Sequence, residues 1–187
     1  MSFLHKRIVV IGTTGSGKSM LGERLGARLG LEYIDLDALF WKPNWIEIAR
    51  EEFRARVETA TRTPGWVVAG NYRSVRDILW PRAEAVIWLD YPFLVIFVQL
   101  WRRTWRRWRS KELLWGTNYE RFWPQLKLWS KDSLFNWLLQ TYWRRKREFP
   151  VLFAQPEYQH LSIYRFKSPR ETEEWFQQLT LHRKEYT

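Results

Sequence analysis

The sequence has no cysteine and only two methionines among its 187 residues. The lack of cysteine excludes a disulfide framework and every zinc or redox site built on cysteine. Long apolar runs are also missing. The longest, residues 86–101, contains Asp90 and Pro92 and falls short of the roughly 20 apolar residues that a membrane span requires. The apolar run at 8–11 is too short for a secretory signal, so we expect a cytoplasmic protein without a transmembrane segment.

What the sequence does contain is an excess of tryptophan and of positive charge. There are 14 Trp residues, and the net charge is +11. Residues 101–147 hold 13 Lys+Arg against three acids, a net charge of +10, together with eight of the Trp residues. Aromatic residues interleaved with Arg are typical of nucleic-acid binding, of membrane-surface binding, or of a site that closes on a nucleotide. Composition alone leaves these three open.

Short apolar runs alternate with helical stretches along the rest of the chain. The predicted strands are residues 7–11, 32–35, 66–69, 85–89 and 161–164. The predicted helices are residues 19–29, 46–61, 74–79, a long one from 93, and 169–182. The last begins with a capping box, Ser168 with Glu171, and has Pro169 at its first position. This alternation predicts an α/β fold with a doubly wound sheet and right-handed crossovers.

Residues 101–147 interrupt the alternation and contain no convincing strand. At about 100° per residue, Trp101, Trp105 and Trp108 fall within an arc of roughly 60°, and the arginines of 102–109 spread over the opposite side. A second helix is predicted at 132–147, with Leu134, Trp137 and Leu138 as its apolar residues and the basic run 144–147 at its C-terminus. We therefore predict one domain, 1–187, with a core of 1–100 and 148–187 and a helical insertion at about 101–147.

Residues 12–19 fit the phosphate-binding pattern G-x-x-x-x-G-K-[ST], between a predicted strand and a predicted helix. Its glycines let the backbone N–H groups curl around phosphate, and the helix N-terminus adds partial positive charge. Lys18 then reaches the β- and γ-phosphates, and the Ser19 hydroxyl ligates Mg²⁺. The sequence thus predicts ATP, or another nucleoside triphosphate, with Mg²⁺. The predicted nucleotide-binding residues are Gly12, Thr13, Thr14, Gly15, Ser16, Gly17, Lys18 and Ser19.

Two further groups of polar residues follow the second and third predicted strands. We expect Asp35 to hold Mg²⁺ and Asp37 to accept a proton or hydrogen bond from an acceptor hydroxyl, since strand ends of an open α/β sheet meet at the ligand crevice. Their spacing places both carboxylates on one side of an extended chain; the alternative is a pair that caps a helix. The substrate-binding candidates after the third strand are Gly70, Asn71, Tyr72 and Arg73, for which the alternative is an ordinary turn.

These motifs, followed by Trp-Leu-Asp-Tyr-Pro at 88–92 and an Arg-rich helix, resemble the adenylate-kinase-like small P-loop kinases. The resemblance is greatest to the branch of DNA topology modulation proteins, and it covers most of the chain to residue 120 and again 161–168. It implies a parallel sheet of strand order 2-3-1-4-5 and a lid after the fourth strand. It also implies that Arg103 and Arg107 are lid arginines and that Ser168 and Arg170 lie near the adenine.

One position departs from that branch. The branch has Asp at the end of the third strand, where this sequence has Ala69. Asp35 is the natural substitute as metal-organising carboxylate, as in shikimate- and gluconate-kinase-like relatives with Asp-x-Asp after the second strand.

The leading hypothesis is an ATP- and Mg²⁺-dependent kinase of a small acceptor, with a nucleotide or nucleoside among the candidates. In this hypothesis Lys18, Asp37, Arg103 and Arg107 are catalytic. The alternative is a nucleotide-dependent nucleic-acid-binding ATPase, in which Trp stacks on bases and Arg neutralises phosphates. A third interpretation places the Trp/Arg helix on an anionic membrane surface.

Overall fold

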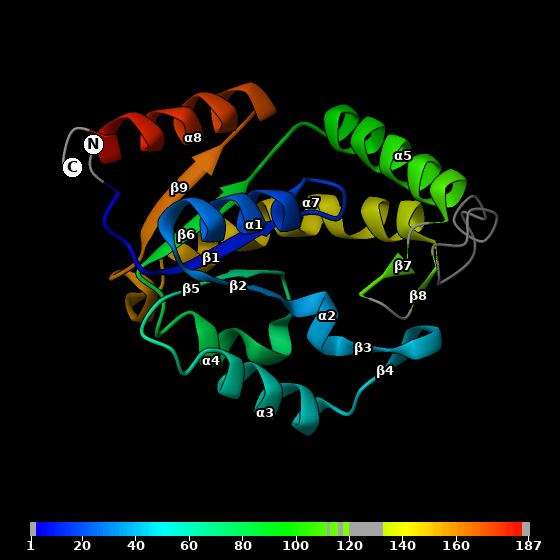
Figure 1. Cartoon of the computed structure of the whole chain (residues 1–187), viewed down its shortest axis with the longest axis horizontal. Coiled ribbons are helices and arrows are strands. Elements are labelled where there is room, and N and C mark those ends of the chain that lie inside the picture. Colours follow the sequence, from blue (N-terminus) through cyan, green and yellow to red (C-terminus); the bar gives the residue numbers. More distant parts are fainter. Residues whose placement is uncertain (1–2, 112, 116–117, 120–132, 185–187) are drawn as a thin grey trace.

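The computed structural model describes residues 3–111, 113–115, 118–119 and 133–184. Its centre is a parallel sheet of five strands (Figure 1). These strands are β1 (Arg7–Gly12), β2 (Glu32–Asp35), β5 (Trp66–Ala69), β6 (Ala85–Leu89) and β9 (Ser162–Phe166). Their order is β2-β5-β1-β6-β9. The labels differ from the expected 2-3-1-4-5 because the short strands β3, β4, β7 and β8 lie outside this sheet; among its own five strands the chain order is the expected one.

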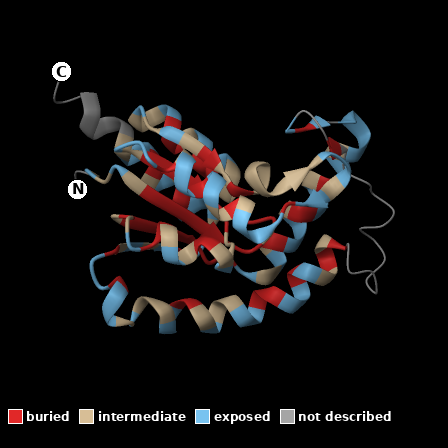
Figure 2. Cartoon of the chain, turned by 90° about the horizontal axis from the view of Figure 1, so that it is seen from below, coloured by how far each residue is buried: buried red, intermediate tan, exposed pale blue. Residues whose placement is uncertain are grey.

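Alternate residues of the strands face two helical layers. Ile8 and Val10 pack on the side of α1 (Lys18–Leu29), α5 (Phe93–Ser110) and α8 (Pro169–Lys184). Val9 and Ile11 pack on the side of α3 (Arg50–Ala60) and α4 (Arg76–Leu79). The long helix α7 (Leu134–Phe153) contributes to both clusters. Figure 2 shows buried residues along the central strands, which explains why these strands are nearly continuous runs of Val and Ile.

Several predicted elements differ at their boundaries. The helix predicted at 46–61 begins only at Arg50, because β4 (Ile46–Glu47) pairs with β3 (Trp41–Lys42) in an antiparallel hairpin. The prediction of an insertion without strands is also wrong, since β7 (Leu113–Leu114) pairs with β8 (Asn118–Tyr119). Both hairpins contain only two residues in each strand, which is too short for the alternation of side chains to stand out.

The second helix of the insertion is longer than predicted. Helix α7 runs through Pro150 to Phe153, and the hydroxyl of its N-cap, Ser133, accepts a hydrogen bond from the Asn136 N–H at 3.3 Å. The predicted start at 132 lies outside the described residues. The basic run 144–147 therefore lies inside the helix rather than at its end, and Trp137, predicted as apolar packing, is exposed. No described helix is long and apolar enough to cross a membrane.

Candidate active site

The loop between β1 and α1 leads into the N-terminus of a helix. Gly17 precedes α1, and among the described residues no side chain caps the first turn of this helix. Free N–H groups at a helix N-terminus, with the positive end of its dipole, favour an anion. The Ser16 hydroxyl is buried, and it has no hydrogen-bond partner among the residues that the structure describes. A phosphate group fits this combination of donors.

Helix α5 packs directly on this loop. Gly15 has φ 82°, and a Cβ there would lie 2.8 Å from the Cβ of Leu100. Glycine is therefore required at this position both for the backbone conformation and for the close approach. As a result, the inner side of α5 borders the phosphate-binding loop.

Lys18, the first residue of α1, lies in a strongly positive environment. Burial, assisted by the charges of Arg145 and Arg103, lowers the pKa of its ammonium group from 10.5 to about 8. Asp37 and Asp35 act in the opposite direction but do not compensate. The five side chains are thus close enough to interact electrostatically, and the site as it stands favours an additional negative charge.

Asp35 ends β2 and serves as the N-cap of the short helix α2 (Leu36–Phe40). Its Oδ1 accepts the Asp37 N–H at 3.0 Å, and its Oδ2 accepts the Tyr33 hydroxyl at 3.3 Å. The side chain of Tyr33 is also hydrogen-bonded to that of Ser19. Burial and the neighbouring Asp37 raise the pKa of Asp35. The two predicted metal-binding residues, Ser19 and Asp35, are therefore linked through one tyrosine.

Asp37 lies in the first turn of α2 rather than on extended chain, so the spacing argument for the two carboxylates is wrong. The helical turn nevertheless keeps the groups close, since Asp35 caps the Asp37 N–H. Asp37 Oδ1 accepts the Tyr72 hydroxyl at 2.6 Å. Burial and Asp37 raise the pKa of Tyr72, which keeps this phenol protonated as a donor. Tyr72 thereby fixes the orientation of the carboxylate.

Gly70 and Asn71 have structural partners at the ends of the strands. A Cβ at Gly70 would lie 2.7 Å from the Cβ of Leu36, so the close approach that glycine permits here is made by Leu36 and not by a ligand. The amide of Asn71 accepts the Gly12 N–H at 3.2 Å and donates to the Gly12 carbonyl. Asn71 therefore holds the first residue of the phosphate-binding loop.

Three arginines surround one carboxylate beside this site. Glu148 on α7 lies 3.3 Å from Arg76 and 3.5 Å from Arg73. Arg145 lies one turn earlier on α7; burial lowers its pKa to about 10, the neighbouring Arg144 lowers it as well, and Glu148 raises it. Asp37 also raises the pKa of Arg145, which places this guanidinium near Asp37. Two carboxylates, Glu148 and Asp37, against three guanidinium groups leave a local excess of positive charge.

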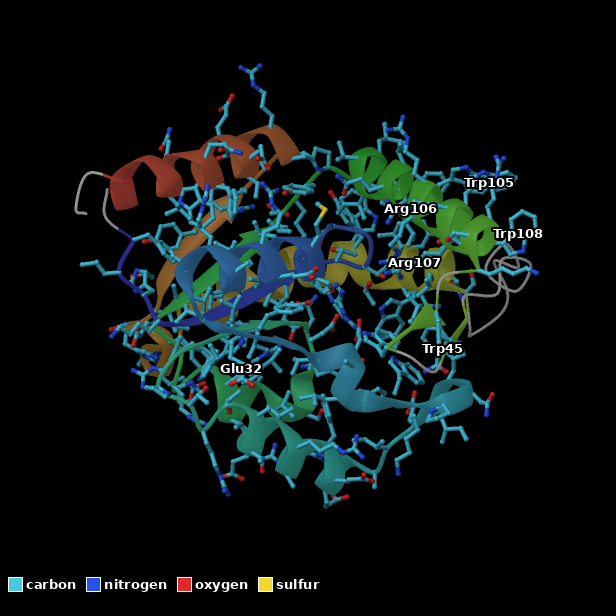
Figure 3. The ribbon with its side chains drawn as sticks, in the orientation of Figure 1. Glu32, Trp45, Trp105, Arg106, Arg107 and Trp108 are labelled. Atoms are coloured by element: carbon cyan, nitrogen blue, oxygen red, sulfur yellow. The ribbon has the colours of Figure 1, made fainter. Side chains whose placement is uncertain are left out.

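The arginines of α5 are divided between its two sides. Arg103 and Arg107 are partly buried, whereas Arg102, Arg106 and Arg109 are exposed. Figure 3 shows Arg107 on the side of the helix that faces the body of the protein.

Packing of the tryptophan side against the core, the alternative to a functional Arg face, is not what the structure shows. The tryptophans Trp101, Trp105 and Trp108 are exposed, and the buried residues of the helix are Ile96, Leu100 and Thr104. Of the five arginines of α5, Arg103 and Arg107 thus lie on the side that faces the candidate active site.

The insertion also contacts the segment after β3. The Trp45 N–H donates to Asn118 Oδ1 at 2.9 Å, and Asn118 Nδ2 donates to the Lys42 carbonyl at 3.2 Å. The rings of Trp45 and Trp115 lie 5.7 Å apart (Trp45 is labelled in Figure 3). Residues of the insertion therefore lie against the chain that follows the two carboxylates.

Ser168 and Arg170 have contacts within the start of α8. The Glu171 N–H donates to Ser168 Oγ at 3.1 Å, and Glu171 accepts the Lys167 N–H at 2.7 Å. Arg170 is highly exposed and pairs with Glu174 at 2.6 Å. The helix begins directly after β9, at the same edge of the parallel sheet as the phosphate-binding loop.

Arg145, Glu148 and Tyr33 were not among the candidates drawn from the sequence. Arg145 could have been found from periodicity, because Leu138, Tyr142, Arg145 and Phe149 recur at the spacing of one helix face. Interpreting the basic run as a helix terminus concealed that pattern. Tyr33 carries no such signal, since a tyrosine in a buried strand is ordinary core.

No protein-family model matches the chain. The shikimate kinase of Paramagnetospirillum magneticum is 54% identical over 37 residues, which are 20% of this chain and 19% of that protein. The shikimate kinase of Halorhodospira halophila is 34% identical over 112 residues, 51% of this chain and 61% of that protein. The match thus spans about a fifth of the first relative and three fifths of the second.

Among solved structures, the chain is similar to shikimate kinase from Acinetobacter baumannii in complex with shikimate. The TM-score is 0.56 at 16% identity, with coverage of 98% of this chain and 96% of that one. The chain therefore shares the fold of that shikimate kinase. The particular branch of DNA topology modulation proteins has no support among these matches.

Proposed function

We propose that this protein is a kinase that transfers the γ-phosphoryl group of ATP to a hydroxyl of a small acceptor. The observation that carries the proposal is the environment of Lys18. Burial lowers the pKa of Lys18 to about 8, and Arg103 and Arg145 lie near it together with Asp37 and Asp35. The Ser16 hydroxyl of the same loop has no hydrogen-bond partner among the described residues. These donors and positive charges suit a bound phosphate. Phosphoryl transfer depends on positioned positive charge of this kind.

The phosphate end of the site comprises the loop 12–17, Lys18 and the inner side of α5. The N–H groups of the loop would bind the phosphate oxygens, and Lys18 would contact the β- and γ-phosphates. Arg103 would neutralise charge that develops on the transferred group, and Arg107, one turn further along the same side, is the second candidate. Thr13 and Thr14 complete the loop, and residues 168–170 would border the adenine.

Mg²⁺ would be held by Ser19 and Asp35, together with phosphate oxygens of the nucleotide. A hydroxyl and one carboxylate are a suitable donor set, because Mg²⁺ in nucleotide sites keeps several waters and takes few protein ligands. Burial and the neighbouring Asp37 raise the pKa of Asp35 more than Lys18 lowers it, and a cation bound at this carboxylate would favour its charged form. When bound, the ion neutralises negative charge on the phosphates.

Asp37 would position the acceptor and take its proton. In the reaction the acceptor oxygen forms a bond to the γ-phosphorus, the bond from that phosphorus to the bridging oxygen of ADP breaks, and the hydroxyl proton passes to the Asp37 carboxylate. Tyr72 occupies Oδ1 of that carboxylate, which leaves Oδ2 for the acceptor. Tyr72 is therefore proposed to act through Asp37.

The acceptor is proposed to carry a negative charge of its own. The three guanidinium groups of Arg73, Arg76 and Arg145 outnumber the two carboxylates near them, Glu148 and Asp37. Guanidinium groups suit carboxylate or phosphate. Both a hydroxylated carboxylic acid and a nucleoside monophosphate meet this requirement. An uncharged nucleoside does not use these arginines.

The test is a panel of acceptors incubated with ATP and Mg²⁺, with ADP release measured against a sample without acceptor. The panel contains shikimate, gluconate, nucleosides, nucleoside monophosphates and single-stranded DNA. We expect ADP release with an anionic small molecule, and none with that molecule in Lys18→Ala. Lys6→Ala, which changes an exposed lysine on the same chain, serves as the matched control.

Full turnover by Lys18→Ala would contradict the proposal. Stimulation by single-stranded DNA alone would instead support the nucleic-acid-binding ATPase. Turnover with uncharged nucleosides but not with their monophosphates would contradict the role given to the arginines around Glu148, while leaving the kinase assignment in place.

A further inference from the structure

The outer side of α5 presents a continuous stripe of exposed apolar side chains. At about 100° per residue, its members fall within an arc of roughly 100°. Leu94 is 73% exposed, and Val98 and Trp105 are each 44% exposed. The complete stripe is Leu94, Phe97, Val98, Trp101, Trp105 and Trp108. Isolated exposed apolar residues are ordinary, but a contiguous stripe marks an interaction surface.

Core packing does not account for this stripe, because α5 already buries a different side. Ile96, Leu100 and Thr104 face inward against the sheet and the phosphate-binding loop. Figure 3 shows Trp105 and Trp108 at the outer end of the helix, away from the central sheet. The helix is therefore apolar on two sides, one that is buried and one that is partly exposed.

The apolar surface continues from α5 to α7. The rings of Phe97 and Phe135 lie 5.3 Å apart, and those of Trp101 and Phe135 lie 5.9 Å apart, so the two helices meet at the border of the stripe. Beyond this contact, Leu139 and Trp143 of α7 are 48% and 59% exposed. Two neighbouring helices thus present one apolar surface to the solvent.

Positive charge borders the stripe on its other flank. Arg102, Arg106 and Arg109 are exposed and lie roughly 60–120° around the helix from Leu94. Helix α5 contains five arginines and no acidic residue. Apolar side chains with tryptophan in the middle and arginine at the edge are the features of a helix that lies in the interface of an anionic membrane. The indole rings suit that polar–apolar boundary, and arginine keeps its charge in water while its stem packs on lipid.

We propose that the outer side of α5, continued by Leu139 and Trp143 of α7, binds the protein to an anionic phospholipid bilayer. Two other partners fit the surface less well. Leu94 and Val98 offer no ring on which a base can stack, and the rings of Trp105 and Trp108 lie 5.3 Å apart, which leaves no space for a base between them. A symmetric dimer through this face would bring the arginines of both copies together.

The experiment is co-sedimentation of the full chain with vesicles of phosphatidylcholine and phosphatidylglycerol, compared with vesicles of phosphatidylcholine alone. We expect binding to the anionic vesicles that weakens as salt is added. Leu94→Gln/Trp105→Gln should reduce binding at least roughly tenfold. The charge variant Arg102→Gln/Arg106→Gln/Arg109→Gln should reduce it about a hundredfold, at about 1 kcal/mol per charge.

The matched control is Leu4→Gln/Val151→Gln, which changes two other exposed apolar residues, at 79% and 66% exposure, and should bind like the wild type. Circular dichroism and ADP release verify that each variant is folded. Trp105→Gln alone replaces the double variant if that one unfolds.

Equal binding to both kinds of vesicle, or no loss in the stripe variants, would overturn the proposal. So would binding of single-stranded DNA or self-association that these variants abolish while vesicle binding is absent.

Discussion

Helix α5 carries arginines on both of its sides, and the surroundings of the two sets differ. Arg103 and Arg107 are partly buried, and Arg103 is close enough to Lys18 to lower its pKa. Arg102, Arg106 and Arg109 are exposed beside the tryptophan stripe. Arginines of one helix therefore belong to two different surfaces, one on each side of α5.

This difference accounts for part of the excess of positive charge in the insertion. A site for phosphoryl transfer uses a few arginines, whereas residues 101–147 hold 13 basic residues. In our account Arg103, Arg107 and Arg145 belong to the candidate active site. Arg102, Arg106 and Arg109 belong to the proposed membrane-binding surface on the outer side of α5. Net charge alone could not make this division, because it takes no account of the direction of a side chain.

The largest effect is expected where the inner side meets the phosphate-binding loop. Lys18→Ala should reduce phosphoryl transfer on the order of a thousandfold, since it removes the charge nearest the transferred group. The measurement is the rate of ADP release at saturating acceptor. Vesicle binding should be unchanged in this variant, because Lys18 interacts with Arg103 on the inner side of α5 and is not part of the exposed stripe. A parallel loss of both activities would indicate unfolding or a single shared surface.

Helix α7 allows the same comparison between a partly buried and an exposed arginine, here at adjacent positions. Arg145→Gln should raise the KM for an anionic acceptor roughly tenfold to a hundredfold, because it removes a charge-assisted contact in a poorly solvated site. The neighbouring Arg144 is exposed, and Arg144→Gln should leave KM within about twofold. Initial rates across acceptor concentrations distinguish the two variants. Equal effects would show that α7 acts through its overall charge only.

A pH series examines the inner side without removing any side chain. In the free protein Lys18 loses its proton as the pH rises through about 8. Affinity for ATP should therefore be constant at lower pH and weaken above pH 8, by about tenfold per unit at most. Lys18→Arg should abolish this decline, because guanidinium keeps its charge. Calorimetric titration with ATP and Mg²⁺ at several pH values measures this affinity. An affinity that does not change with pH in the wild type would contradict the low pKa of Lys18.

The smallest effect is expected at α8, where a structural role and a binding role can be separated. Ser168→Ala removes the cap of the helix and should lower the free energy of unfolding by about 1 kcal/mol. Its KM for ATP should change less than twofold if capping is the main function of this hydroxyl. Denaturant unfolding and ATP kinetics on the same sample give both values. A KM shift without loss of stability would instead assign Ser168 to the nucleotide.

The sheet and the phosphate-binding loop could be predicted from sequence because their signals are local. A run of β-branched residues such as 8–11 favours a strand buried on both faces, and the glycine pattern at 12–19 is typical of a loop between a strand and a helix. The geometry of the residues that follow β2 was harder to predict. Asp35 and Asp37 were found, but for the wrong geometric reason, since a turn of helix and not an extended strand brings them together.

The role of Gly70 and the orientation of α5 depend on tertiary contacts, which the sequence pattern does not reveal. Gly70 has the pattern of a ligand-binding glycine, yet its space is filled by Leu36. The wheel of α5 placed all five arginines opposite the tryptophans, whereas three of them are exposed beside the tryptophans. It also could not say which side of the helix faces the protein. The orientation of α5 depends on Gly15, because the absence of a side chain there lets Leu100 of α5 pack against the loop. This contact joins segments that are far apart in the chain.

The most direct test of the central claim compares Arg103→Gln/Arg107→Gln with Arg102→Gln/Arg106→Gln, two pairs from the same helix that differ in side. Each is assayed for kcat with the best acceptor and for binding to anionic vesicles. Our account predicts that the inner pair lowers kcat about a hundredfold or more and retains vesicle binding, whereas the outer pair retains kcat and loses vesicle binding. Equal loss of kcat in both pairs would contradict it.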